Sequence, residues 1–141
     1  MLETDAQLHE QLAQLLARAN RRQFWLFFLG ADHRILDPIM PMDDHPDLPD
    51  EMCESEDLGR IPFAQLIVDR AGSVMEMVGA DSIVFVWERP GPPKPTENDL
   101  HWARAIAREA DRLRVTLRAQ FLLHDGGLRR FADAEQRGSG G

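Results

Sequence analysis

Residues 83–102, with the sequence IVFVWERPGPPKPTENDLHW, decide the fold of this chain. They begin inside the apolar run 82–87, which predicts a strand buried on both faces of a sheet. The loop 89–95 follows, and it is stiff because each proline fixes its own φ and restricts the residue before it. Thr96 and Asp99 then form a Thr-x-x-Asp cap that begins the next helix. Active sites of several hydrolases lie at a strand–loop–helix junction of this kind.

Hydrophobic periodicity predicts the other helices and strands. The predicted helices span 4–21, 62–78 and 96–113, and the remaining predicted strands span 23–30, 34–40, 115–123 and 127–132. The resulting order is α-β-β-α-β-α-β-β. Because the strand at 82–87 must be covered on both sides, we expect an α/β (α+β) fold with a single mixed β-sheet flanked by helices on both faces.

The length of 141 residues fits one domain. We expect an N-terminal helix within 1–21, a domain over 22–134 that includes an acidic surface loop at 41–60, and a flexible tail at 135–141. The N-terminus is polar and acidic, unlike a signal peptide, and no apolar run reaches the roughly 20 residues that span a bilayer. We therefore expect a cytoplasmic protein with no membrane partner. The single Cys53 cannot form an internal disulfide.

The negative charge of the chain is concentrated in one segment. Residues 43–57, DDHPDLPDEMCESED, hold eight of the 24 acids and no Lys or Arg, and the other 16 acids equal the 16 bases. We interpret the segment as a solvated loop that repels nucleic acid and offers an interaction surface for a basic partner. The residues of this candidate surface are Asp43, Asp44, His45, Asp47, Asp50, Glu51, Glu54, Glu56 and Asp57.

The stretches FWLFFLGADHRIL and VGADSIVFVWERPGPPKPTENDLHWARAIAREADRLRVTLRAQFLLHDGG are similar to the opening hairpin and the core of a known domain. The chain resembles the JAB/MPN (JAMM) family, and most of all its bacterial RadC branch. The resemblance covers roughly residues 22–134. It implies a mixed sheet flanked by helices.

The zinc motif of that family runs His-x-His-Pro, then a Gly/Pro-rich loop, then Ser-x-x-Asp. In family members that bind zinc, two imidazoles and a carboxylate hold Zn²⁺, and the fourth ligand is a water that the metal makes acidic. Carried onto this sequence, the first His falls on Trp87 and the second on Arg89. Pro90 matches the proline of the motif, Thr96 replaces its Ser, and Asp99 matches its Asp.

The substituted positions argue against a metal site. Trp cannot bind Zn²⁺, and Arg carries a fixed positive charge. The catalytic Glu that the family places in an early strand falls near Ile39, with only Asp37 close by. The resemblance therefore implies a degenerate motif with no metal, no cofactor and no catalytic residue, as in a pseudoenzyme of the JAMM metalloprotease type. Thr96 and Asp99 are explained by helix capping alone.

The same comparison yields a structural hypothesis about the vacated pocket. We expect Trp87 to fill it, and Arg89 to face Asp99 at the place where the positive charge of the metal would be. Without that partner, Asp99 would keep a carboxylate beside an empty site.

We expect the chain to be a non-catalytic, RadC-like protein-interaction module with an unidentified protein partner. Its working surfaces would be the loop 41–60 and the cleft around Trp87 and 90–95. One alternative is a divergent metal-dependent isopeptidase or hydrolase that uses His45 and His101 together with Asp99. A further alternative, by analogy with the family name alone, is a DNA-repair-associated accessory protein.

The helix after the junction carries a basic stripe. Helical spacing places His101 with Arg104, Arg108 and Arg112 on the outer face, so His101 is expected to be exposed rather than a ligand. The simplest interpretation of the stripe is a solvated face, and the alternative is that it pairs with the acidic segment of the same or another chain. Unpaired strand edges also leave room for a homodimer.

Overall fold

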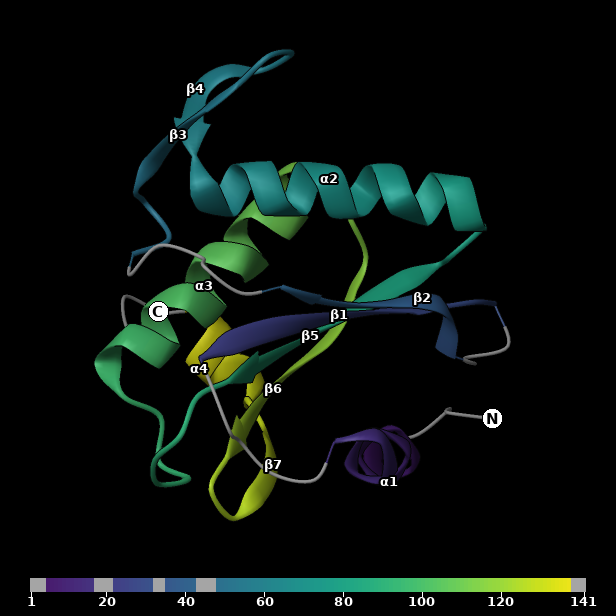
Figure 1. Cartoon of the computed structure of the whole chain (residues 1–141), viewed down its shortest axis with the longest axis vertical. Helices are drawn as coiled ribbons and strands as arrows, with labels where there is room; N and C mark the ends of the chain where they lie inside the picture. The colour runs from purple at the N-terminus through teal and green to yellow at the C-terminus, as the bar shows by residue number, and fades with distance from the viewer. Residues whose placement is uncertain (1–4, 17–21, 32–34, 43–47, 138–141) are drawn as a thin grey trace.

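The computed structural model of the chain describes residues 5–16, 22–31, 35–42 and 48–137. A five-stranded sheet and a separate two-stranded hairpin are flanked by helices (Figure 1). The helices and strands are α1 (Asp5–Leu15), β1 (Gln23–Leu29), β2 (Ile35–Met42), β3 (Met52–Ser55), β4 (Gly59–Pro62), α2 (Phe63–Val78), β5 (Ser82–Glu88), α3 (Glu97–Arg112), β6 (Leu117–His124), β7 (Gly127–Arg130) and α4 (Asp133–Arg137). The predicted α/β (α+β) class is confirmed.

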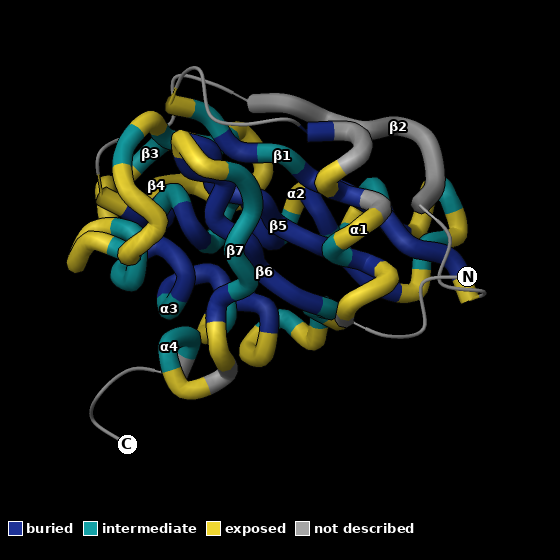
Figure 2. The backbone as a smooth tube through the Cα atoms, turned by 90° about the horizontal axis from the view of Figure 1, so that it is seen from below, coloured by how far each residue is buried: buried dark blue, intermediate teal, exposed yellow. Residues whose placement is uncertain are grey.

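Strand β5 lies at the centre of the larger sheet, whose order is β2-β1-β5-β6-β7. It pairs antiparallel with β1 and parallel with β6, so the sheet is mixed. A parallel pair needs a crossover connection, and α3 supplies it. All seven residues of β5 are buried, as predicted from the apolar run. Figure 2 shows this burial continuing from β5 into β6.

The sheet separates two apolar cores. Because side chains alternate along a strand, Phe85 and Trp87 of β5 join the core beneath α2 and α3, whereas Val84 and Val86 join the core that faces α1. Helix α1 closes the second core with one leucine stripe, consisting of Leu8 and Leu12 together with Leu16 just beyond its end. Figure 1 shows α2 and α3 on one face of the sheet and α1 on the other, so the predicted covering of both faces is confirmed.

The predicted acidic loop at 41–60 is wrong over much of its length. Its first two residues belong to β2, and its second half forms the antiparallel hairpin β3–β4. In this hairpin half-buried Cys53 lies opposite buried Ile61, so one face of the two strands is partly covered. Gly59 allows the tight turn because its φ of 76° lies in the left-handed region.

The chain ends also differ from expectation. The first helix ends at Leu15 instead of residue 21, and residues 17–21 lie outside the described part. The predicted flexible tail from residue 135 begins within α4, whose start is capped because the Ala132 N–H donates to Glu135 Oε1 at 2.7 Å. Among the described residues, no helix is long and apolar enough to cross a bilayer.

Candidate functional site

Arg89 lies directly after β5 and turns its guanidinium toward the first turn of α3. Its Nε and Nη2 atoms donate to Oδ2 of Asp99 at 3.1 and 2.8 Å. The side chains are only 15% and 11% exposed, so this ion pair is largely shielded from water. The expected contact between Arg89 and Asp99 is present.

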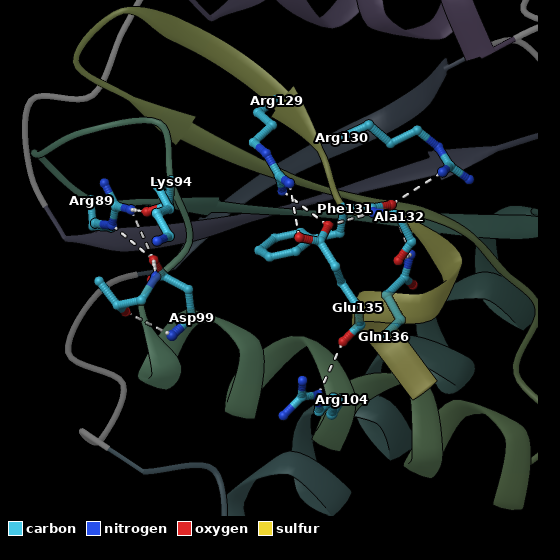
Figure 3. A network of polar contacts seen from close by, with 11 residues as sticks. Arg89, Lys94, Asp99, Arg104, Arg129, Arg130, Phe131, Ala132, Glu135 and Gln136 are labelled. Atoms are coloured by element: carbon cyan, nitrogen blue, oxygen red, sulfur yellow. Dashed lines mark hydrogen bonds and ion pairs between the residues drawn. The ribbon is translucent and has the colours of Figure 1, made fainter. Parts of the chain in front are cut away.

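The proline-rich loop curls around the same guanidinium (Figure 3). Arg89 Nη1 donates to the carbonyl oxygen of Pro92 at 2.7 Å, and Nη2 donates to that of Lys94 at 3.1 Å. Gly91 has a φ of 131°, and a Cβ at this position would lie 3.0 Å from Arg89 Nη1. A side chain there would strain the backbone and press on the guanidinium, so glycine is required for this loop conformation.

The carboxylate of Asp99 also begins helix α3. Its Oδ2 accepts from the Thr96 N–H at 2.8 Å, and the Thr96 hydroxyl oxygen accepts from the Asp99 N–H at 3.0 Å. This is a reciprocal capping box, as the Thr-x-x-Asp pattern predicted. Asp99 Oδ2 therefore receives three N–H donors, two from Arg89 and one from the backbone. Pro90, the remaining motif position, is exposed on the loop.

Trp87 lies in the core between the sheet and α3. Its ring is 5.2 Å from those of both Phe24 and Trp102, measured between ring centroids. Its indole N–H donates to Oε1 of Gln120 at 2.9 Å, and the Gln120 amide donates to the Ala103 carbonyl at 2.8 Å. In this series of hydrogen bonds from Trp87 through Gln120 to Ala103, each polar side-chain atom has a partner, as stable burial requires.

Little space remains between Trp87 and Arg89. The cavity there is about 30 Å³, and its lining residues are Arg22, Gln23, Trp87, Glu88, Arg89, Asn98, Asp99 and Trp102. About 10–15 Å³ of such space is enough to hold one water molecule, so the cavity has room for only a few. Trp87 is therefore packed in the core, and Arg89 is paired with Asp99 beside it.

The motif Glu expected near Ile39 falls in strand β2, which pairs antiparallel with β1. The side chains of β2, including that of Asp37, lie outside the described atoms. In the described ranges, no group of three or more His, Cys, Asp and Glu side chains is arranged to hold a metal ion.

A buried histidine borders the junction. His124 ends β6 in a buried position, and its Nδ1 accepts from the Gly126 N–H at 3.0 Å. Burial, and secondly the positive charge of Arg89, lowers the pKa of His124 below its ordinary value. The neighbouring Asp125 N–H donates to the Gly91 carbonyl at 3.0 Å, which ties the β6–β7 turn to the proline-rich loop.

A second polar network holds α4 against the sheet and α3 (Figure 3). Arg129 forms a two-bond pair with the Glu135 carboxylate at 3.1 and 2.8 Å, which lowers the pKa of Glu135. Arg104 Nε donates to the Glu135 carbonyl at 3.1 Å. Sequence reasoning missed this network because its members lie on three separate segments and each looks like an ordinary surface charge.

The acidic segment is partly paired with the helices beneath it. Asp50 meets His101 of α3 at 3.0 Å and Arg108 at 3.9 Å, so two members of the basic stripe pair with this segment within one chain. His101 is partly exposed and binds Asp50, and no contact joins it to Asp99. Asp57 is bound by Arg70 of α2 at 2.8 Å.

The remaining acids divide into two groups. Glu51, Glu54 and Glu56 are exposed, with no side-chain hydrogen bond or ion pair to any described residue. Four further members of the predicted surface lie outside the described residues, namely Asp43, Asp44, His45 and Asp47.

Comparisons with known proteins assign no family to the chain. No family model matches it, and none of the curated proteins is similar to it.

Proposed function

We propose that this chain is a metal-free, non-catalytic domain of the RadC-like JAB/MPN type that acts through protein interaction. The observation that carries the proposal is the bond between Arg89 and Asp99. The resemblance gives Asp99 the role of the one retained zinc ligand, and here its carboxylate is already neutralised by a guanidinium.

The chemistry of the pair supports the proposal. Arg does not lose its proton in proteins, so its charge cannot be removed to admit a cation. Zn²⁺ would have to separate the shielded pair, and leaving one such charge unpaired costs about 3–5 kcal/mol. Structural and catalytic zinc sites use Cys, His and carboxylate ligands, which Trp87 and Arg89 cannot replace.

The junction retains a role in stability that does not depend on a metal. Thr96 and Asp99 cap α3, and Arg89 holds the proline-rich loop in one conformation. This explains why part of the motif is present although its chemistry is not. A folded domain without a reactive centre acts by binding other molecules through its surface. The acidic segment is the most distinctive part of that surface.

The test is a zinc measurement on the full chain, purified without chelator from zinc-supplemented cells. The proposal predicts no stoichiometric zinc in the wild-type chain. It also predicts that Trp87→His/Arg89→His, which restores the ligand pattern beside Asp99, binds about one zinc ion per chain.

If loss of Trp87 unfolds the core of the double variant, the zinc measurement is made on the single variant Arg89→His instead. Circular dichroism verifies that each variant is folded. Stoichiometric zinc in the wild-type chain that disappears on Asp99→Ala would refute the proposal. A folded Trp87→His/Arg89→His variant that binds no zinc would refute its RadC-like part.

A further inference from the structure

We infer that residues 48–62, the hairpin β3–β4 with the turn before it, form a docking surface for a basic, apolar-containing peptide segment of another protein. This inference rests on the proposed function and names the kind of partner that its acidic surface would take. We call residues 48–62 the acidic hairpin.

Exposed apolar side chains gather on the acidic hairpin. Four large apolar residues are exposed in the described part of the chain, and three of them lie here, with Leu48 50%, Met52 44% and Leu58 37% exposed. The fourth is Met77, at the far end of α2. Leu48 lines a hollow with Leu100 and His101 of α3, while Met52 lies on β3 and Leu58 in the turn of the hairpin. Exposed apolar side chains that recur along one segment indicate a surface that becomes covered on binding.

The acidic hairpin has one covered face and one open face. Its inner face places Ile61 and Cys53 toward α2, while Met52 and Glu54 are exposed on the alternate positions of β3. The two strands pair only with each other in the described part of the chain. Figure 1 shows the hairpin projecting beyond the first turn of α2, away from the five-stranded sheet.

The charge of the acidic hairpin is only partly compensated, because Arg60 lies opposite Glu54 in the strand register but forms no ion pair with it. The acidic hairpin holds five carboxylates and a single base, Arg60. Two of the carboxylates are used internally, whereas Glu51, Glu54 and Glu56 meet no cation among the described residues. The acidic hairpin exposes acidic residues between apolar ones, and a partner with Lys or Arg beside apolar residues is complementary to it in charge and polarity. A nucleic acid would be repelled.

Two anchors hold the surface in place. Arg70 donates to Asp57 at 3.1 and 2.8 Å and to the Ser55 hydroxyl oxygen at 3.0 Å, which fixes the turn of the hairpin to α2. At the other end, Asp50 is held by His101 of α3. A surface that is ordered before binding loses less conformational freedom when the partner arrives.

The experiment measures binding of a labelled peptide to the full chain by fluorescence anisotropy. The probe is a synthetic peptide of about 12 residues with alternating Arg and Leu, long enough to cover the four-residue strands. A second peptide with Gln in place of Arg tests the need for positive charge. Binding is measured at about 50 and 300 mM salt, because salt screens the attraction between exposed charges and so shows how much of the binding depends on it.

Two pairs of variants isolate the acidic hairpin. Glu51→Gln/Glu54→Gln/Glu56→Gln removes its three uncompensated charges, and Glu10→Gln/Glu76→Gln/Asp81→Asn removes three exposed charges elsewhere. Leu48→Ser/Met52→Ser removes apolar contacts, with Met77→Ser as its control. We expect each hairpin variant to weaken binding about tenfold, with the controls within about twofold of wild type.

Equal loss in the hairpin and control variants would overturn the inference, because binding would then follow net charge alone. So would an absence of binding to the Arg–Leu peptide, or self-association of the chain that the Glu→Gln variant abolishes. If the chain contains no zinc, these results contradict only the proposed docking surface and not the proposed function. Stoichiometric zinc defeats the proposed function whatever the peptide does.

Discussion

Two of the arginine–aspartate pairs among the described residues, Arg89–Asp99 and Arg70–Asp57, have similar bond lengths and very different surroundings. Arg89 and Asp99 are 15% and 11% exposed, whereas Arg70 and Asp57 are 47% and 60% exposed. Each arginine donates two N–H groups to its aspartate, with a shortest distance of 2.8 Å in both pairs. The pairs differ in that Arg89 bonds one oxygen of Asp99 while Arg70 bonds both oxygens of Asp57, but the number and length of the bonds do not distinguish them.

Their surroundings decide what each pair does. Water can replace either partner of the exposed pair, so its effect on stability is small and is screened by salt. Separation of the shielded pair strands a charge between the proline-rich loop and α3, where water cannot fully solvate it. The shielded pair thus fixes the junction, while the exposed pair orients the tip of the hairpin.

The largest expected effect is that of Asp99→Ala. We expect it to lower the free energy of unfolding by about 3 kcal/mol, because it leaves Arg89 unpaired and removes the cap of α3. Urea denaturation measures the change, and Asp99→Asn should lose less because its amide oxygen can still accept from Thr96. If Asp57→Ala destabilises the chain as much as Asp99→Ala, the distinction between the two pairs is wrong.

Gln120→Leu tests whether the buried hydrogen bonds next to the ion pair also contribute to stability. It removes the Gln120 oxygen that accepts from the Trp87 indole N–H and the amide that donates to the Ala103 carbonyl, which should cost about 1–3 kcal/mol. Unfolding monitored by tryptophan fluorescence measures the loss. The control Gln65→Leu, at a half-buried position on α2, should change stability by less than about 0.5 kcal/mol. Equal effects at the two positions would contradict the account.

As the pH falls, the contribution of His124 to stability should be lost before that of Asp57 in the hairpin. The folded-state pKa of His124 is lowered, so the unfolded chain binds a proton first, and stability falls as the pH drops below about 6.5. The pKa of Asp57 is held well below its usual range by Arg70, so its contribution is lost only below about pH 4.

The measurement is stability by urea denaturation between about pH 7.5 and 5, with His124→Asn as the comparison. The asparagine variant keeps a hydrogen-bond acceptor near Gly126 but does not titrate, so its stability should depend less on pH. An unchanged slope in this range would show that His124 does not cause the acid sensitivity.

Arg70→Ala should have the smallest effect on global stability. Because both partners are largely exposed, the urea midpoint should stay close to that of wild type at moderate salt. Hydrogen exchange should nevertheless speed up in the backbone of β3 and β4, since Arg70 anchors their turn. A large global loss, or unchanged exchange in the hairpin, would remove the contrast with Arg89.

The central part of the fold could be predicted because its signals are local. The apolar run of β5 and the Thr96–Asp99 cap each identify their element within a few residues. The contact between Arg89 and Asp99 could also be predicted, since both residues flank one short loop. The carry-over from a known zinc motif then suggested that their charges would meet.

Other parts of the structure depend on contacts between distant segments. Hairpin β3–β4 contains few apolar residues, and its anchor pairs Asp57 with Arg70 of the next helix. Helix α4 is five residues long and is held by the network around Glu135. Such pairings leave no periodic pattern in the sequence, so acidic and polar composition suggested a loop and a tail instead.

The most direct test of the central claim is the melting temperature of the full chain with excess EDTA, without additions, and with added ZnCl₂. A ligand that binds only the folded state raises the melting temperature, and its removal lowers it. Because Arg89 already occupies Asp99, the account predicts the same melting temperature in all three conditions. A melting temperature that falls with EDTA, recovers with zinc, and loses this response in Asp99→Ala would contradict it.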